Sequence, residues 1–143
     1  MSPIPPVNGS SPRRQPDASP ATDLQRDRRD DVFVVERPWG QFQQFVTDQH
    51  ATVKTMLVKP GHRLSLQWHR ARSEMWQVVH GPVLVTVGEE TWEAQVGELI
   101  WIPQGTLHRL EGVSDKEGLV LEVAFGQFDE EDIVRIEDDY SRS

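Results

Sequence analysis

The sequence contains no cysteine and no long apolar run, and each absence excludes classes of protein. Without cysteine the chain has no disulfides, no thiolate metal site and no cysteine nucleophile. No apolar stretch approaches the ~18 residues that a membrane-spanning helix needs, so we expect no membrane partner. Residues 1–20 are rich in proline and serine and lack the apolar centre of a secretory signal. The expected location is therefore the cytoplasm.

Basic residues are outnumbered, and the imbalance is uneven along the chain. The formal net charge is −8. Residues 1–31 carry five Arg and five Asp, so residues 32–143 hold the whole excess, with 18 acidic and 10 basic side chains. An acidic domain repels the phosphate backbone, so we expect no nucleic-acid partner. An anionic metabolite would need cations concentrated locally, which a divalent metal and a few arginines can supply.

Composition divides the 143 residues into two parts. Residues 1–31 hold Pro, Ser, Arg and Asp with almost no large apolar side chains, so they should be disordered. From residue 32 onward, about ten short apolar or alternating runs recur between turn formers, without a convincing amphipathic helix. This texture is typical of one all-β domain, a sandwich or barrel. Only the acidic segment 129–140 has a composition that allows a helical turn.

Two segments combine metal-binding residue types with a regular spacing of glycines. The first contains Gln67, His69 and Glu74, and the second contains His108. Glycines and a proline bracket these four residues at fixed offsets, namely Gly61, Gly81, Gly97, Pro103 and Gly105. Because Gln67 and His69 are two residues apart, a strand would project both from one face. We expect all four side chains to face the interior of a barrel and to hold a metal with open coordination positions.

The proposed ligand set restricts the metal. Two imidazoles, one carboxylate and one amide oxygen suit Zn, Mn, Fe, Co or Ni, and offer nothing to a thiophilic metal. One carboxylate on a divalent ion leaves the site near a charge of +1, which favours an anionic substrate. We expect His50, His62 and His80 to be surface or core residues, because no such spacing surrounds them.

These two segments resemble the paired cupin motifs, with Gln67 in the place of the usual first histidine. The string LSLQ-x-H narrows the resemblance to the C-terminal cupin domain of type II phosphomannose isomerases, found in enzymes that also carry a mannose-1-phosphate guanylyltransferase domain. The matching strings are RPWG (37–40), VKTMLVKPG (53–61), RLSLQWH (63–69), RSEMW (72–76), VTVG (85–88), IPQGTLHRLEG (102–112), LEV (121–123) and EEDIVRIEDDY (130–140). The resemblance implies a cupin double-stranded β-helix, or jelly roll, over residues 32–143.

The resemblance also implies a reaction, the interconversion of mannose 6-phosphate and fructose 6-phosphate. A metal would polarise the sugar oxygens and stabilise enediolate charge, while a positioned base moves the proton. Arg72 and Arg135 lie in matching strings, and with Lys54 they are the candidates for binding the phosphate and assisting catalysis.

The chain departs from the family pattern beside the ligands, which leaves alternatives open. Histidines usual in the family are missing at Arg70, Ala71 and Met75. Metal binding should survive this loss, but proton transfer could fail, which would leave a non-catalytic metal- and sugar-binding module. Another cupin enzyme, such as an Fe(II) oxygenase, is the third hypothesis. Exposed edge strands also make a homodimer an expectation.

Overall fold

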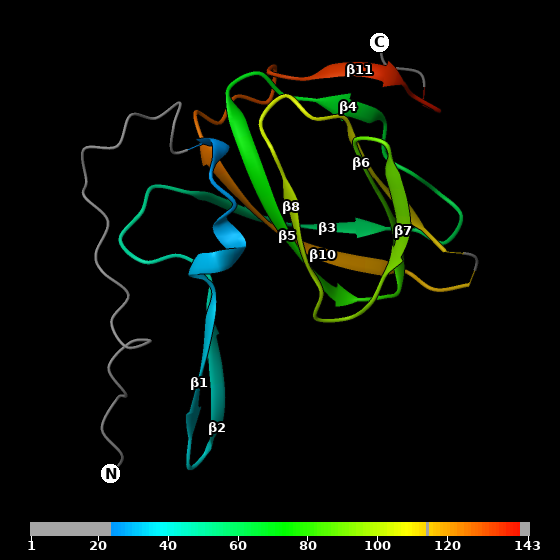
Figure 1. Ribbon diagram of the computed structural model, residues 1–143. Coiled ribbons are helices and arrows are strands. Elements are labelled where there is room, and N and C mark those ends of the chain that lie inside the picture. The colour runs from blue at the N-terminus through cyan, green and yellow to red at the C-terminus, as the bar shows by residue number, and fades with distance from the viewer. Residues whose placement is uncertain (1–23, 114, 141–143) are drawn as a thin grey trace.

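The structure of the protein is a computed structural model that describes residues 24–113 and 115–140. Its regular structure is almost entirely β, in three antiparallel sheets (Figure 1). A short 3-10 helix, η2 (Arg28–Asp31), precedes the strands. The strands are β1 (Phe33–Arg37), β2 (Gly40–Gln44), β3 (Thr52–Val58), β4 (Leu66–Trp68), β5 (Arg72–His80), β6 (Val83–Val87), β7 (Glu90–Ala94), β8 (Leu99–Ile102), β9 (His108–Gly112), β10 (Gly118–Gly126) and β11 (Val134–Glu137).

Two of the sheets pack face to face around the main core. One has the strand order β3-β10-β5-β8 and the other the order β11-β4-β9-β6-β7. The core residues between them are Val58, Trp76, Val78, Val83, Val85, Ala94, Ile100, Ile102, Leu110 and Val120. Every strand pairing that the structure describes is antiparallel. The all-β jelly roll predicted from the sequence is confirmed.

Strand β5 shows how the alternation of side chains along a strand places residues in the site. Glu74 and Trp76 lie in register with Ile102 and Ile100 of β8, and their side chains face the interior. Met75, between them, belongs to a separate apolar cluster with Trp101 and faces the other side of the sheet. Because alternate residues point to opposite faces, one strand supplies both a buried carboxylate and an outer apolar surface.

The N-terminal part of the described chain is packed against that outer surface. Leu24 joins the cluster of Met75, Trp101, Val123 and Phe125. The guanidinium of the buried Arg28 lies 4.4 Å from the centre of the Phe125 ring. The predicted disorder of residues 1–31 therefore does not extend to residues 24–31, because one leucine and a cation–π contact anchor a polar segment that composition alone places in solvent. Residues 1–23 lie outside the described residues.

The acidic segment near the C-terminus contains a strand where the sequence allowed a helical turn. Val134 and Arg135 of β11 pair with Trp68 and Gln67 of β4. The edge of β4 supplies backbone hydrogen-bond partners that a short isolated helix would lack, so pairing outweighs the weak helical tendency. The segment thereby closes the edge of the sheet beside Gln67.

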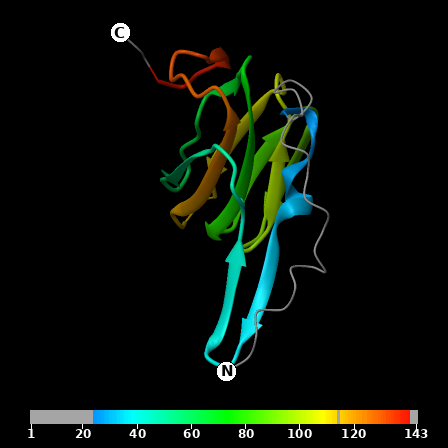
Figure 2. The same ribbon diagram turned by 90° about the vertical axis from the view of Figure 1, so that its left-hand side faces the viewer.

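A third sheet projects from this body. β1 and β2 form a two-stranded hairpin that extends beyond the two larger sheets (Figures 1 and 2). Among the described residues, no helix is long and apolar enough to cross a bilayer.

Replacing Leu24 tests whether residues 24–31 belong to the folded body. We expect Leu24→Ala to lower the free energy of unfolding by about 2 kcal/mol, because it removes buried methyl groups from the outer cluster. Val96→Ala is the control, since Val96 is exposed and should change stability by less than about 0.5 kcal/mol. Urea unfolding of both variants measures the difference, and equal midpoints would contradict the packing of this segment.

Candidate metal centre

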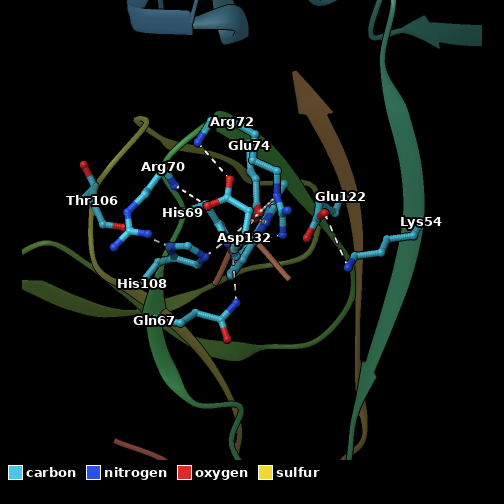
Figure 3. Close-up of polar contacts among 12 residues, drawn as sticks. Lys54, Gln67, His69, Arg70, Arg72, Glu74, Thr106, His108, Glu122 and Asp132 are labelled. Atoms are coloured by element: carbon cyan, nitrogen blue, oxygen red, sulfur yellow. Dashed lines mark hydrogen bonds and ion pairs between the residues drawn. The ribbon is translucent and has the colours of Figure 1, made fainter. Parts of the chain in front are cut away.

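The four predicted ligands come from both large sheets and lie close to one another (Figure 3). Gln67 of β4 and His108 of β9 are register partners, and His69 follows β4 directly. Glu74 reaches the same place from β5 in the opposite sheet. The candidate ligand atoms of His69, Glu74 and His108 lie within 4.8 Å of one another, and all three residues are buried. The spacing in the sequence therefore does bring these three side chains together.

Both imidazoles are oriented by backbone carbonyls. His69 Nδ1 lies 2.6 Å from the carbonyl oxygen of Asp132, and His108 Nδ1 lies 2.9 Å from that of Thr106. A carbonyl only accepts, so each Nδ1 carries a proton and donates it. Each Nε2 then faces Glu74, at 3.1 Å from Oε2 for His69 and 3.8 Å from Oε1 for His108.

One buried imidazole nitrogen of this group is available to a ligand. His108 Nε2 is buried and has no hydrogen-bond partner among the described residues. Such a group costs free energy unless something satisfies it. Carbonyl-fixed histidines that present Nε2 beside a carboxylate are the usual arrangement of metal ligands. The His69, Glu74 and His108 group thus fits a divalent metal.

The Glu74 carboxylate is held in its charged form. Burial by itself raises the pKa of Glu74, but its contacts with His69, His108 and the Trp76 indole outweigh burial and hold this pKa well below its usual value. Trp76 Nε1 donates to Oε1 at 2.9 Å, and Arg72 Nε donates to Oε2 at 3.2 Å. Burial also lowers the pKa of His108, against the charge of Glu74, so its lone pair is available at neutral pH.

Gln67 lies beside the three-residue group rather than within it. Its Oε1 accepts a hydrogen bond of 2.5 Å from Ser65 Oγ, and its Nε2 lies 3.5 Å from His69 Nε2. The side chain is therefore close enough to contribute, but its amide oxygen is engaged with Ser65.

Asp132 supports the site, and sequence reasoning missed it. Its carboxylate accepts the backbone N–H groups of Arg70 at 2.8 Å and Ala71 at 2.9 Å. Burial raises the pKa of Asp132, but these two hydrogen bonds dominate and lower it below the usual value. The residue thus ties the C-terminal segment to the turn after His69 and aims its own carbonyl at that imidazole. The EEDI string of residues 130–133 was part of the family resemblance, but only the fold shows that this segment contacts the turn after His69.

A cavity of about 60 Å³ adjoins the ligands. One water needs ~10–15 Å³ measured in this way, so the cavity has room for several water-sized groups. Its lining includes the predicted cations Lys54 and Arg72. The lining residues are Lys54, Met56, Leu64, Ser65, Gln67, Arg72, Glu74, Trp76, His108, Arg109, Leu110 and Glu122.

The third predicted cation lies elsewhere. Arg135 is not among the residues that line the cavity, and its Nε lies 4.0 Å from Asp138. Its assistance to catalysis stays a prediction.

A second buried carboxyl group, Glu122 of β10, lines the same cavity and was missed by sequence reasoning. Its Oε2 has no hydrogen-bond partner among the described residues and lies 3.8 Å from Lys54 Nζ. Burial, with the charge of Glu74, raises the pKa of Glu122 to about 8 against the opposing charge of Lys54. One signal was available: in the run LVLEVAF, Glu122 is two residues from Val120 and so shares the inward face.

The three positions at which this chain lacks a family histidine have different surroundings. Met75 is buried in the outer cluster, on the opposite face of β5 from Glu74. Arg70 is exposed, with its guanidinium 5.2 Å from the Trp68 ring, and Ala71 is half-buried. None of the three lines the cavity. The other histidines of the chain, His50, His62 and His80, are exposed.

Comparison with known proteins decides the family. Residues 25–138 match the family described as "Mannose-6-phosphate isomerase C-terminal". The chain belongs to this family. The match covers every strand from β1 to β11, so the resemblance read from the sequence motifs is confirmed.

The curated relatives are much longer proteins. The chain is 42% identical over 110 residues to the xanthan biosynthesis protein XanB of Xanthomonas campestris, and 38% identical over 110 residues to the alginate biosynthesis protein AlgA of Pseudomonas aeruginosa. A mannose-1-phosphate guanylyltransferase, ManC of Salmonella typhimurium, is 39% identical over 109 residues. Each alignment covers 76% of this chain, but only 23–24% of the relative. The chain thus spans about a quarter of their length.

Solved structures share the fold. The capsular polysaccharide assembling protein CapF of Staphylococcus aureus superimposes with a TM-score of 0.54 at 24% identity, over 74% of this chain and 34% of that one. An oxalate oxidase gives a TM-score of 0.54 at 20% identity, over 60% of this chain and 46% of the enzyme. At this identity the likeness concerns the fold alone, and the cupin fold is confirmed.

The raised pKa of Glu122 predicts how this residue affects stability in metal-free protein. The unfolded carboxyl group releases its proton near its ordinary pKa of 4.5, whereas the folded one retains it until about pH 8. Unfolding therefore releases a proton between these values, and the contribution of Glu122 to stability falls as pH rises through the window, by up to roughly 1.4 kcal/mol per pH unit.

The variant Glu122→Gln isolates this effect. The difference in free energy of unfolding between variant and wild type should grow in favour of the variant from pH 5 to pH 8. Chemical denaturation of chelator-treated protein at four or five pH values gives the difference. Glu117→Gln is the matched control, because Glu117 is exposed. A pH-independent difference for Glu122→Gln would show that its carboxyl group titrates normally.

Proposed function

We propose that this chain is a metal-dependent sugar-phosphate isomerase that interconverts mannose 6-phosphate and fructose 6-phosphate. The observation that carries the proposal is the buried group of His69, Glu74 and His108, with its unpartnered nitrogen, at a cavity that also holds a lysine. The family match and the polysaccharide-related names of the relatives support the substrate class. Because the chain spans about a quarter of the length of those relatives, the activities of the whole relatives are not assigned to it.

The metal would be held by His69, Glu74 and His108, and Gln67 would become the fourth ligand by turning its amide, because its Oε1 now accepts from Ser65 Oγ and its Nε2 faces His69. Two imidazole nitrogens and carboxylate and amide oxygens suit Zn, Mn, Co, Fe or Ni. When bound, a divalent metal supplies Lewis-acid polarisation of the sugar oxygens and stabilises the negative charge of an enediolate. Glu74 is the one proposed ligand whose negative charge offsets part of the positive charge of the metal, and its lowered pKa keeps the carboxylate ionised.

Isomerisation needs a group that takes a proton from one carbon and returns it to the next. Glu122 is suited to this task because its Oε2 lies in the cavity and is not committed to another residue by a hydrogen bond. Its position beside Lys54 provides a charge that stabilises the carboxylate form during the transfer. The histidines absent at Arg70, Ala71 and Met75 are not required for this step, because those positions lie outside the cavity lining.

Lys54 and Arg72 have different parts in binding the anionic substrate. Arg72 is buried, and its guanidinium already donates hydrogen bonds to Glu74 and to the carbonyl of Asp129. It therefore orients the Glu74 carboxylate and adds positive charge to the cavity. The Lys54 side chain is partly exposed, and within the described residues its one ion pair is with Glu122, at 3.8 Å. Lys54 is therefore the cation that can reach the substrate oxygens with least rearrangement.

Elemental analysis tests the metal site directly. We expect purified protein, loaded with each candidate metal and dialysed, to retain about one divalent ion per chain. His108→Ala should lose it, because the variant removes the ligand whose Nε2 has no other partner. His80→Ala, at an exposed histidine, is the matched control and should retain the metal. Equal metal content in both variants would mean that the ion is bound elsewhere.

Turnover tests the reaction. Metal-loaded wild type should convert mannose 6-phosphate, measured by coupling fructose 6-phosphate formation to glucose 6-phosphate detection. Glu122→Gln should lower kcat by about 10²- to 10⁴-fold, the usual contribution of a positioned base, while metal content stays unchanged. Glu117→Gln serves as control. An unchanged kcat in Glu122→Gln would move the base elsewhere.

The same assays distinguish the rival functions. Sugar-phosphate binding in calorimetry without turnover would select a non-catalytic metal- and sugar-binding module. Oxygen consumption by the iron-loaded protein would select an oxygenase. Absence of turnover with every candidate metal would overturn the isomerase proposal.

A further inference from the structure

Two of the cations that line the cavity share one aromatic neighbour, Phe128, in the segment after β10. The centre of its ring lies 4.3 Å from Arg72 Cζ and 5.3 Å from Lys54 Nζ. Both distances are within the ~6 Å over which the face of an aromatic ring attracts a cation. Phe128 is half-buried and is not among the residues that line the cavity. It therefore acts on the cavity through the two cations that it contacts.

Backbone contacts fix Phe128 on both sides. Gly126 ends β10 at a φ of +105°, and a Cβ there would lie 2.5 Å from the carbonyl oxygen of Ala71. Only glycine permits this conformation and this close approach, and the next N–H along the chain donates to the same carbonyl at 3.2 Å. On the other side, the carbonyl of Asp129 accepts from Arg72 Nη1 at 3.0 Å. The position of the ring is thus set by a segment anchored at both of its ends.

The two cations depend on this ring to different extents. Arg72 is buried and donates hydrogen bonds to Glu74 and to a backbone carbonyl, so its guanidinium is fixed without the ring. Lys54 reaches the cavity from β3 with a partly exposed side chain (Figure 3). Its one ion pair within the described residues, with Glu122 at 3.8 Å, is longer than a hydrogen bond. The flexible stem of the lysine therefore depends on the ring to keep its ammonium at the cavity.

An aromatic ring holds a lysine in a way that suits an anion-binding site. A carboxylate in hydrogen-bond contact would cancel the charge of the ammonium and accept its N–H groups. A ring attracts the same cation through the negative charge density on its face, and it carries no net charge. Because the chain has a net charge of −8, an anion needs a local cation whose charge and donors stay available.

We propose that Phe128 is a positioning residue, whose ring holds the Lys54 ammonium at the cavity and leaves the N–H donors to the phosphate oxygens of the substrate. The role toward the substrate rests on the proposed isomerase function, whereas the contact of the ring with Lys54 does not. Phe128 is neither a cavity-lining residue nor a proposed metal ligand. Its effect should therefore be on substrate binding and not on metal binding.

A small set of variants separates the effect of the ring face from that of apolar volume. Phe128→Leu keeps an apolar side chain but removes the ring face, and Phe128→Trp keeps a face that attracts cations at least as strongly. Phe42→Leu is the matched control, because Phe42 is half-buried on the hairpin of β1 and β2 and its ring lies 5.7 Å from Arg37 Cζ. Circular dichroism checks that each variant retains the fold.

Acylation of lysines in metal-free protein tests the contact independently of the reaction. The chain has three lysines, and two of them, Lys59 and Lys116, are exposed and serve as internal standards. Mass spectrometry after brief treatment with an amine-acylating reagent gives the rate at Lys54 relative to these standards. The ratio should rise by about twofold or more in Phe128→Leu, because the released ammonium spends more time in solvent. Phe128→Trp and Phe42→Leu should keep the wild-type ratio.

Calorimetry with metal-loaded protein tests the role in binding. Phe128→Leu should raise the Kd of mannose 6-phosphate by about three- to tenfold, the loss expected for one cation–π contact, while metal content stays unchanged. In turnover, KM should rise by a similar factor and kcat should stay within about twofold, because the ring holds a group that binds substrate in the ground state and the transition state alike. Phe128→Trp should restore Kd and KM, and Phe42→Leu should leave both unchanged.

The two measurements separate failure of the contact from failure of the proposed function. An unchanged acylation ratio in Phe128→Leu, or an equal rise in Phe128→Trp, would overturn the contact and with it the inference. A raised ratio with an unchanged Kd for mannose 6-phosphate would overturn the role of the contact in binding. A wild type that shows the expected acylation pattern but binds no sugar phosphate would overturn the proposed isomerase, while the contact of the ring with Lys54 would stand.

Discussion

A charged carboxylate enclosed in a barrel is the constraint on which the rest of the site depends. Glu74 is buried between two sheets and would be unstable there without compensating charge or hydrogen bonds. The surrounding residues provide them: two imidazoles, the Trp76 indole and the Arg72 guanidinium all face its oxygens. The two imidazoles and the Arg72 guanidinium are fixed in turn by the backbone carbonyls of Asp132, Thr106 and Asp129. The C-terminal segment is thus part of the site.

The cavity contains two carboxyl groups whose environments separate their chemistry. Glu74 receives hydrogen bonds and lies beside imidazoles, which lowers its pKa, whereas Glu122 is buried near that negative charge and has its pKa raised to about 8. Pairs of this kind commonly divide the tasks of holding charge and moving a proton. The separation gives a physical reason to assign ligation to Glu74 and proton transfer to Glu122 in the proposed isomerase.

The two faces of the four-stranded sheet serve different purposes. The inner face carries the core and the polar cavity, and the outer face is mostly apolar. Met75 shows the consequence, because a histidine there would lie on the outer side and not beside Glu74. A family difference in sequence next to a ligand is therefore not automatically a difference in the cavity.

The sequence by itself determined an all-β domain and the candidate ligands His69, Glu74 and His108, because strand alternation and glycine-bracketed turns are local properties that the chain order records. The jelly roll followed from the resemblance of its motifs to a family. The sequence could not reveal Asp132 and Glu122 as parts of the site, the distance of Arg135 from the cavity, or the anchoring of residues 24–31. Those depend on which strands become neighbours and on contacts such as Arg28 with Phe125 between segments far apart in the chain. Only tertiary structure fixes such long-range proximity, because many pairings satisfy the same alternation.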